Sequence, residues 1–156
     1  MSTIAERVAS LRERIATLEA RYGRPAGSVT LLGVSKTHEA ARVREAHAAG
    51  LSQFGESYVQ EALPKIEALA DLPLTWHFVG RIQGNKTAAI AAGFAWVHGI
   101  DRLRIARRLS EQRPAHLPPL ECCIEVNLSG EASKGGATPE ELPALAAAVA
   151  ALPRLR

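Results

Sequence analysis

The chain begins with a helical pattern of apolar residues. Apolar side chains recur at alternating spacings of four and three, at Ile4, Val8, Leu11, Ile15, Leu18 and Tyr22. This period is typical of one face of an amphipathic helix, and Thr3 and Glu6 occupy the two positions of a capping box at its start. The pattern is too short for a stable coiled coil, so we expect a helix that packs against its own domain.

From Val29 onward the period changes, and short β-rich runs alternate with helical runs. We predict strands over residues 29–34, 53–54, 75–79, 95–98 and 121–128. The helical runs carry their own start and stop signals. Gly50 marks the end of one helix. The starts of the next helices are marked by Ser57 with Gln60 as a capping box, by Asp101 as a cap, and by Thr138 with Glu141. Pro64 should kink or split the third helix, because proline lacks the N–H that a helix interior needs.

Five strands that are each followed by a helix predict a parallel sheet and the α/β class, because parallel neighbours need a crossover connection. The strands recur roughly every 23 residues, a short and regular repeat that favours a (β/α)-barrel. Eight such units would need about 70 more residues. We therefore predict a TIM-like (β/α)8 barrel with an extra N-terminal helix, truncated after the fifth βα unit, as a single incomplete domain over residues 1–156. An open five-stranded fold is the alternative.

Composition and charge argue against several classes of function. The 156 residues carry a net charge of only +3, and the arginines are scattered, so nucleic acid is not an expected partner. Cys122 and Cys123 are adjacent and no CxxC or Cys/His spacing occurs, so neither a disulfide framework nor a metal site is expected. The N-terminus does not resemble a signal peptide and no apolar run of about 18 residues is present. We expect a cytoplasmic protein without membrane contact.

The candidate chemistry lies in the loops at the carboxyl ends of the strands, where α/β proteins bind ligands. Three of the four lysines, Lys36, Lys86 and Lys134, fall in these loops. Side-chain alternation predicts that Lys36, His77 and Asn127 converge near a barrel mouth. An amine desolvated in a partly apolar pocket is a candidate nucleophile toward aldehydes, and Lys36 fits this role. A solvated surface lysine and a satisfied core histidine are the alternatives that the residues alone leave open.

Five segments, in this order and at these intervals, are "LLGVSKTHEA", "FGESYVQEALPKI", "WHFVGRIQGNK", "VHGIDRLRIARRL" and "VNLSGEASKGG". Together they resemble the pyridoxal phosphate homeostasis protein family, single-domain relatives of the alanine racemase N-terminal barrel. The resemblance implies that pyridoxal 5'-phosphate is held as a Schiff base on Lys36, with Ser57, His77 and Asn127 lining the site. It also implies a carrier without catalytic turnover, which balances vitamin B6 and amino-acid pools and passes the cofactor to apo-enzymes.

The chain departs from the family pattern at three places. Ser57 replaces the asparagine of "GENY", and Arg81 and Gly84 replace the histidine and serine of "GHLQSNK". The family's sixth to eighth strands, with the segment that binds the cofactor phosphate and a late arginine, are absent. A pyridoxal phosphate-dependent amino-acid racemase is an alternative function, although its second base would be a tyrosine and only Tyr22 and Tyr58 are present. A third possibility is a truncated barrel that binds no ligand.

Overall fold

The computed structural model describes residues 2–156, which form one parallel sheet with helices between the strands. The strands are β1 (Gly33–Val34), β2 (Gln53–Glu56), β3 (Thr75–Phe78), β4 (Trp96–Ile100) and β5 (Glu121–Ile124), and they lie in sequence order. The helices are α1 (Ile4–Arg21), α2 (Ala40–Ala48), α3 (Val59–Ala68), the 3-10 helix η1 (Gly84–Lys86), α4 (Thr87–Gly93), α5 (Leu103–Gln112) and α6 (Leu142–Ala150).

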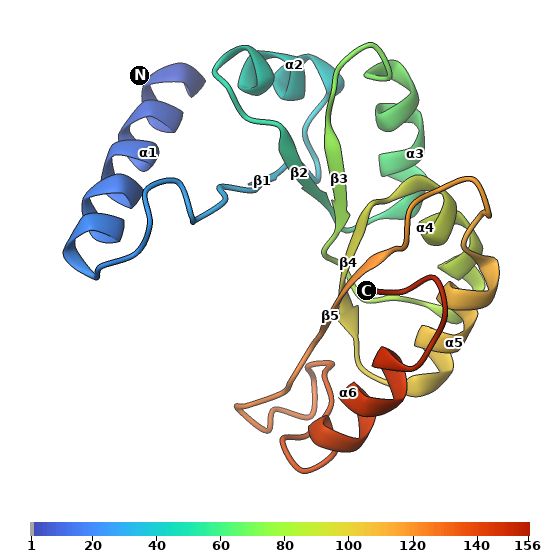
Figure 1. Ribbon diagram of the computed structural model, residues 1–156. Coiled ribbons are helices and arrows are strands. Elements are labelled where there is room, and N and C mark those ends of the chain that lie inside the picture. The colour runs from blue at the N-terminus through green and yellow to red at the C-terminus, as the bar shows by residue number, and fades with distance from the viewer. Residues whose placement is uncertain (1) are drawn as a thin grey trace.

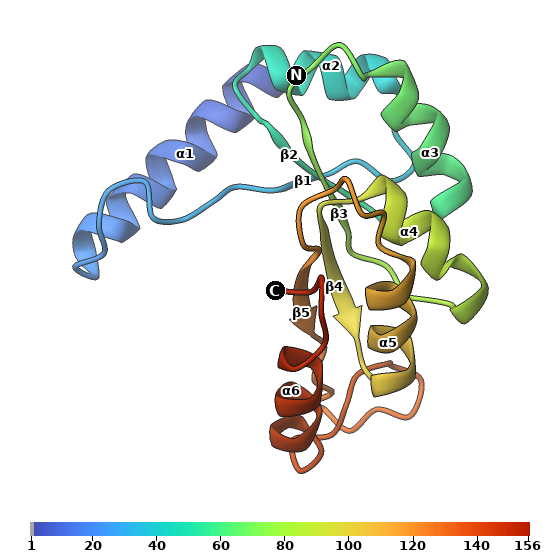
Figure 2. The same cartoon turned by 45° about the vertical axis from the view of Figure 1, so that its right-hand side comes forward.

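The sheet has one covered face and one open face. Helices α2, α3, α4 and α5 follow one another in an arc along the outer face of the sheet, and α6 continues the arc beside β5 (Figures 1 and 2). Each strand pairs in parallel with the next one in the sequence. This is the arrangement of successive units of a (β/α)-barrel, so the predicted α/β barrel class is confirmed.

The hydrophobic core fills the layer between the sheet and the arc of helices. The strands contribute Phe54, Trp76, Phe78 and Val97, and the helices contribute Val43, Ala62, Ile90, Ile105 and Leu109, all buried. The rings of Phe78 and Phe94 meet edge to face with centroids 5.3 Å apart. Burial of each of the larger aliphatic or aromatic side chains stabilises the fold by about 1.5–3 kcal/mol, which fixes the sheet against its helices.

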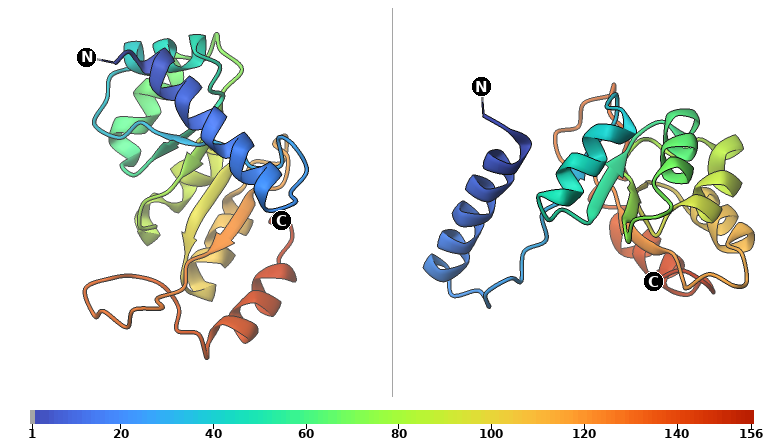
Figure 3. Two further views of the ribbon diagram at one scale, coloured as in Figure 1. Left: turned by 90° about the vertical axis from the view of Figure 1, so that its left-hand side faces the viewer. Right: turned by 90° about the horizontal axis from the view of Figure 1, so that it is seen from above.

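Helix α1 begins as predicted but packs only in part. The capping box of Thr3 and Glu6 is formed. Val8 is buried, whereas Leu11 and Tyr22 on the same apolar face are 46% and 68% exposed. Arg12 donates a 2.6 Å hydrogen bond to the carbonyl of Gly50 and so ties α1 to the end of α2. Seen from above, α1 stands beside the arc rather than within it (Figure 3).

Several predicted boundaries are wrong. Strand β1 covers Gly33–Val34 instead of 29–34, because it lies at a sheet edge and pairs only with β2. Strand β5 ends at Ile124 instead of 128, where the chain turns into a long loop. Helix α3 runs unbroken through Pro64, so it is not split.

Two of the predicted helix caps are wrong, and a third, before α6, is confirmed. Neither α3 nor α5 has a side-chain cap, so Ser57 and Asp101 do not cap them, and Asp101 instead pairs with Arg102 at 2.8 Å. The reciprocal bonds between Thr138 and Glu141 are formed just before α6.

The last residues of the chain run beside β5. Leu155 forms a parallel bridge with Leu120, and the N–H of Arg156 donates to the carbonyl of Leu120 at 3.0 Å. The C-terminus therefore lies against the β5 edge of the sheet (Figure 1). A strand-like pairing thus follows α6. Within residues 2–156, no helix combines the length and the apolar character that a membrane crossing requires.

A buried arginine fixes the end of α4. Arg113 is 6% exposed, and it donates to the carbonyls of Ala91 and Phe94 at 2.6 and 2.7 Å and to that of Pro118 at 2.8 Å. A cation is favourable here because carbonyl groups with partial negative charge collect at the C-terminus of a helix. Burial nevertheless lowers the pKa of the guanidinium.

We expect Arg113→Met to lower the free energy of unfolding by about 3 kcal/mol, because three charge-assisted bonds to carbonyls are lost. Urea unfolding followed by circular dichroism measures the change. Arg107→Met, on the exposed side of the same region, is the matched control and should change stability by less than about 0.5 kcal/mol. Equal effects of the two substitutions would contradict this role of Arg113.

Candidate functional site

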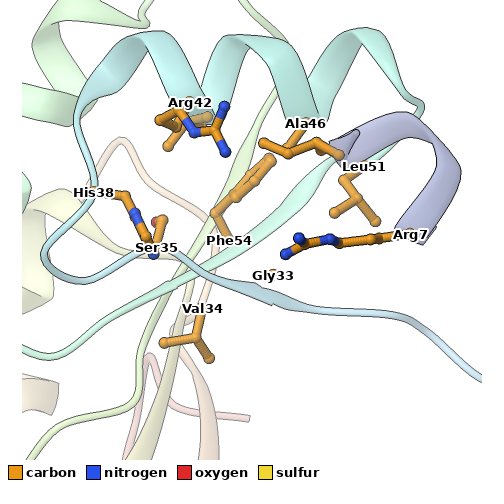
Figure 4. Close-up of a pocket in the computed structure, with 11 residues that line it drawn as sticks. Arg7, Gly33, Val34, Ser35, His38, Arg42, Ala46, Leu51 and Phe54 are labelled. Atoms are coloured by element: carbon orange, nitrogen blue, oxygen red, sulfur yellow. The ribbon is translucent and has the colours of Figure 1, made fainter. Parts of the chain in front are cut away.

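The open face of the sheet is concave and is formed by alternate residues of the strands. Val34 points away from Phe54 and Leu51, which lie on the helix side of β1 (Figure 4). Val34 is accordingly 50% exposed. A Cβ atom built on Gly55 would lie 2.9 Å from Leu32 and 3.3 Å from Val79, so these two apolar side chains cover Gly55 on the same face. An apolar, partly open surface thus lies just below the end of β1.

A histidine pair forms a polar layer on this face. His77 Nε2 lies 2.7 Å from Gln53 Oε1, and His77 Nδ1 lies 2.9 Å from His98 Nε2. The amide oxygen of Gln53 can only accept, so we assign the His77 proton to Nε2 and expect His98 to donate to Nδ1. The His77 ring also stacks on Trp96 with centroids 5.4 Å apart.

Both histidines are neutral at pH 7. Burial lowers the pKa of His77 to about 4, with a smaller contribution from His98, and burial also lowers the pKa of His98. A proton added to His77 would have to enter the Nδ1 position, which already accepts a hydrogen bond. His77 is therefore a satisfied histidine of the inner face, one of the two alternatives that the sequence leaves open.

Lys36 lies in a tight turn directly after β1. The N–H of Ser35 donates to the carbonyl of Gly55 at 2.8 Å, and the N–H of His38 donates to the carbonyl of Ser35 at 3.1 Å. Between them Thr37 has a φ of 67°, a left-handed conformation that is rare for a β-branched residue. The Lys36 side chain is exposed, and within the described residues it forms neither an ion pair nor a hydrogen bond.

A buried ion pair lies beneath this turn. Lys65 of α3 contacts Glu56 Oε1 at 2.6 Å, and the two side chains are 5% and 0% exposed. The Lys65 ammonium also donates to the carbonyl of Ser35 at 2.9 Å, and the Ser35 hydroxyl donates to the same Glu56 oxygen at 2.6 Å. Glu61 lies 3.3 Å from Lys65 and accepts the N–H of Thr37.

Ser57 lies where three strand ends pack backbone to backbone. A Cβ atom on Gly80 would fall 2.9 Å from the Cα of Ser57, and one on Gly99 would fall 2.8 Å from the carbonyl oxygen of Gly80. A cavity of about 280 Å³ beside this contact is lined by Ser57 together with the cations Arg81 and Lys86. The "GRIQGNK" loop therefore remains basic despite its departures from the family pattern.

Asn127 is engaged in its own loop. Its amide nitrogen donates to the carbonyl of Glu131 at 3.0 Å, and its amide oxygen accepts the N–H of Gly130 at 3.0 Å. Within residues 2–156, no hydrogen bond joins any two of Lys36, Ser57, His77 and Asn127. Val34, rather than Lys36, is level with His77 across β2, so His77 lies two residues deeper than the lysine. The expected convergence of Lys36, His77 and Asn127 is therefore not seen as direct contact.

A separate cavity of about 220 Å³ lies between α1, β1 and α2 (Figure 4). Arg7, His38 and Arg42 contribute polar groups to its lining, and Leu51 and Phe54 contribute apolar ones. None of the four predicted site residues lines it. No group of three or more metal-ligating side chains occurs in the described part of the chain.

Three charged residues near Lys36 were not predicted from the sequence, namely Glu56, Glu61 and Lys65. One signal was available, because Glu61 and Lys65 are four residues apart on a helix, the spacing of a favourable ion pair. Glu56 carried no such signal. A carboxylate on a buried strand face is unusual unless it is paired, and its partner is identified only by the fold.

Acid should destabilise the protein through His77. The pKa of this group is about 4 in the folded chain and about 6.5 when unfolded, so only the unfolded state gains a proton between these values. Stability is therefore lost as the pH falls from 6.5 to 4, by about 3 kcal/mol at most. We expect His77→Asn to flatten the pH dependence of urea unfolding between pH 4.5 and 7, whereas the exposed control His116→Asn keeps it. Parallel curves for His77→Asn and the wild type would contradict the assignment.

Comparison with known proteins gives consistent matches. The family model described as alanine racemase, N-terminal domain, matches residues 7–156. The chain is 64% identical over its full length to a pyridoxal phosphate homeostasis protein of Pseudomonas aeruginosa, and 51% identical to one of Escherichia coli K12. It spans 68% of the length of each.

Solved structures agree with this match. The structure of PipY of Synechococcus elongatus PCC7942 with PLP bound superposes with a TM-score of 0.83 at 37% identity, covering 99% of this chain and 67% of that one. Alanine racemase of Bacillus anthracis superposes with a TM-score of 0.61 at 13% identity, covering 96% of this chain and 38% of that one. The second likeness concerns the fold alone.

Proposed function

The chain belongs to the alanine racemase N-terminal domain family, and from this we propose that it binds pyridoxal 5'-phosphate through Lys36 and takes part in vitamin B6 and amino-acid homeostasis. One structural observation carries the proposal. Lys36 presents an exposed amine at the carboxyl end of β1, beside the apolar concave face of the sheet, and no residue among 2–156 pairs with it as a counter-ion. The names of the relatives and the PLP-bound PipY structure support the same ligand.

The residues of the site fit this cofactor. Its aldehyde condenses reversibly with a primary amine to form a Schiff base, and this is the chemistry that it brings. Lys36 supplies the amine from a backbone that is held on both sides. Leu32, Val34 and Val79 supply an apolar surface, and Gly55 adds no side chain to it, which suits a flat aromatic ring. The neutral pair of His77 and His98 adds no competing charge.

The remaining predicted residues receive distinct roles in the proposal. Ser57 follows β2, the strand that pairs with β1, and it is the proposed polar neighbour of the cofactor. His77 shapes the inner face below Lys36 through Gln53 and His98. Asn127 orders the loop after β5, which borders the same end of the sheet.

We further propose that the protein is a carrier rather than an enzyme, that it acts in the cytoplasm, and that apo-enzymes receive the cofactor from it. The relatives are named for homeostasis, which supports this role. A reversible covalent link to Lys36 keeps a reactive aldehyde away from other amines and still allows its release to a competing amine.

Replacement of Lys36 tests the binding proposal. We expect the full chain to develop the visible absorption of a Schiff base when pyridoxal 5'-phosphate is added, and Lys36→Ala to abolish it. Lys134→Ala removes an exposed amine from the loop after β5 and is the matched control, with absorption retained to within about twofold. The proposal fails if the wild type shows no such absorption, or if Lys36→Ala shows as much as the wild type.

A racemase is the second candidate, because alanine racemases share the fold. Tyr22 and Tyr58 are 68% and 55% exposed, and in the described part of the chain neither side chain forms a hydrogen bond that would orient it as a base. We expect no conversion of L-alanine to D-alanine by the cofactor-loaded protein above the background of free cofactor, as measured by chiral chromatography. Turnover in the ordinary enzymatic range of about 1–1000 per second would establish the racemase instead.

A further inference from the structure

We infer that Glu61 and Lys65 of α3 are positioning residues for Lys36: they hold the left-handed backbone of Thr37 and thereby fix the turn that presents the amine. The inference rests on the proposed function only in taking Lys36 as the reacting group. It assigns a role to two charged residues of the helix layer.

The conformation of Thr37 needs an external support. With a φ of 67°, Thr37 occupies a region that L-residues with branched side chains avoid, because the Cβ substituents crowd the backbone. Such a residue persists only where surrounding contacts determine it. The support here is the Glu61 carboxylate, which accepts the N–H of Thr37.

Glu61 is itself held in place by Lys65. The two side chains are four residues apart on α3, with Lys65 Nζ 3.3 Å from Glu61 Oε1. The same ammonium donates to the carbonyl of Ser35 at 2.9 Å. Lys65 therefore reaches both neighbours of Lys36, Ser35 directly and Thr37 through Glu61.

A residue of the sheet, Glu56, holds Lys65 and Ser35 in place. Glu56, in β2, binds Lys65 at 2.6 Å and accepts the hydroxyl of Ser35 at 2.6 Å through one carboxylate oxygen. Glu56 and Lys65 are almost completely buried, so water cannot replace either partner. We call Glu56, Glu61 and Lys65 the turn clamp.

The turn clamp leaves the Lys36 side chain free. The contacts between the clamp and the turn go to the hydroxyl and carbonyl of Ser35 and to the N–H of Thr37, and none of them goes to the lysine amine. The backbone on both sides is thus fixed while the amine stays available. A turn held in this way reduces the conformational freedom that is lost when the amine bonds to a ligand.

Glu61 is the residue on which to test the clamp. Its side chain is 33% exposed, and its removal leaves Lys65 paired with Glu56, so no buried charge is stranded. We compare Glu61→Ala with Glu61→Gln, which keeps an acceptor oxygen, and with Glu67→Ala, an exposed residue of the same helix, as the control. Thermal unfolding of each variant establishes that the fold is intact.

The first readout does not need the cofactor. Amide hydrogen exchange at Thr37, measured by NMR on the full chain, should accelerate at least about tenfold in Glu61→Ala, because the N–H loses a charged acceptor. It should change less in Glu61→Gln and stay at the wild-type rate in Glu67→Ala. An unchanged rate in Glu61→Ala would refute the clamp.

The second readout is the formation constant of the Schiff base with pyridoxal 5'-phosphate. We expect a drop of about tenfold in Glu61→Ala, as for the loss of one charge-assisted bond. Thr37→Gly should make the protein much less sensitive to Glu61→Ala, to within about threefold, because glycine adopts positive φ without steric cost. Faster exchange with an unchanged formation constant would refute the positioning role.

The two readouts separate the inference from the proposed function. A wild type that forms no Schiff base refutes the proposed function, and accelerated Thr37 exchange in Glu61→Ala would still support the clamp. A wild type that forms the Schiff base, combined with the same Thr37 exchange in Glu61→Ala, refutes the clamp and leaves the proposed function standing.

Discussion

The ion pair between Lys65 and Glu56 joins the helix layer to the sheet at the point where β1 ends, and the geometry around Lys36 depends on it. Two opposite charges buried together lose their hydration, and their attraction repays that loss only when further hydrogen bonds satisfy them. Ser35 provides those bonds through its hydroxyl and its carbonyl. The second oxygen of Glu56 is buried without a partner, so the pair is better explained as a device that fixes geometry than as a source of net stability.

The two faces of the sheet have different roles in the fold. The convex face carries the large apolar side chains, such as Phe54 and Phe78, that hold the helices. The concave face carries the polar layer of Gln53 and the two histidines beside the apolar side chains of Leu32, Val34 and Val79. Because alternate residues of one strand serve the two faces, a short strand such as β2 supplies both core packing and site surface.

The sequence was sufficient for the class of fold and for the position of Lys36. The change from a helical to a strand period is a strong signal, and the recurrence of strands at a regular interval follows from it. Strand pairing depends on the tertiary fold. The apolar run 29–34 therefore predicted a longer strand than the two residues, Gly33 and Val34, that pair with β2 at the sheet edge. Asp101 was a plausible cap by type, but Arg102 provides it with an opposite charge that local propensity ignores. The pairing of Glu56 with Lys65 needed the fold, since nine residues separate them and only the packing of α3 on β2 brings them together.

The close contact of Ser57, Gly80 and Gly99 has a consequence for how a molecule can approach the concave face. Three strand ends that touch through their backbones leave no side chain to rotate aside, and each can move only if the others move with it. The rim above β2, β3 and β4 is therefore stiff. The loop after β5 is different, because residues 128–134 are exposed and are joined to the rest mainly by their own hydrogen bonds. The rim thus combines a stiff part above β2, β3 and β4 with an exposed loop after β5.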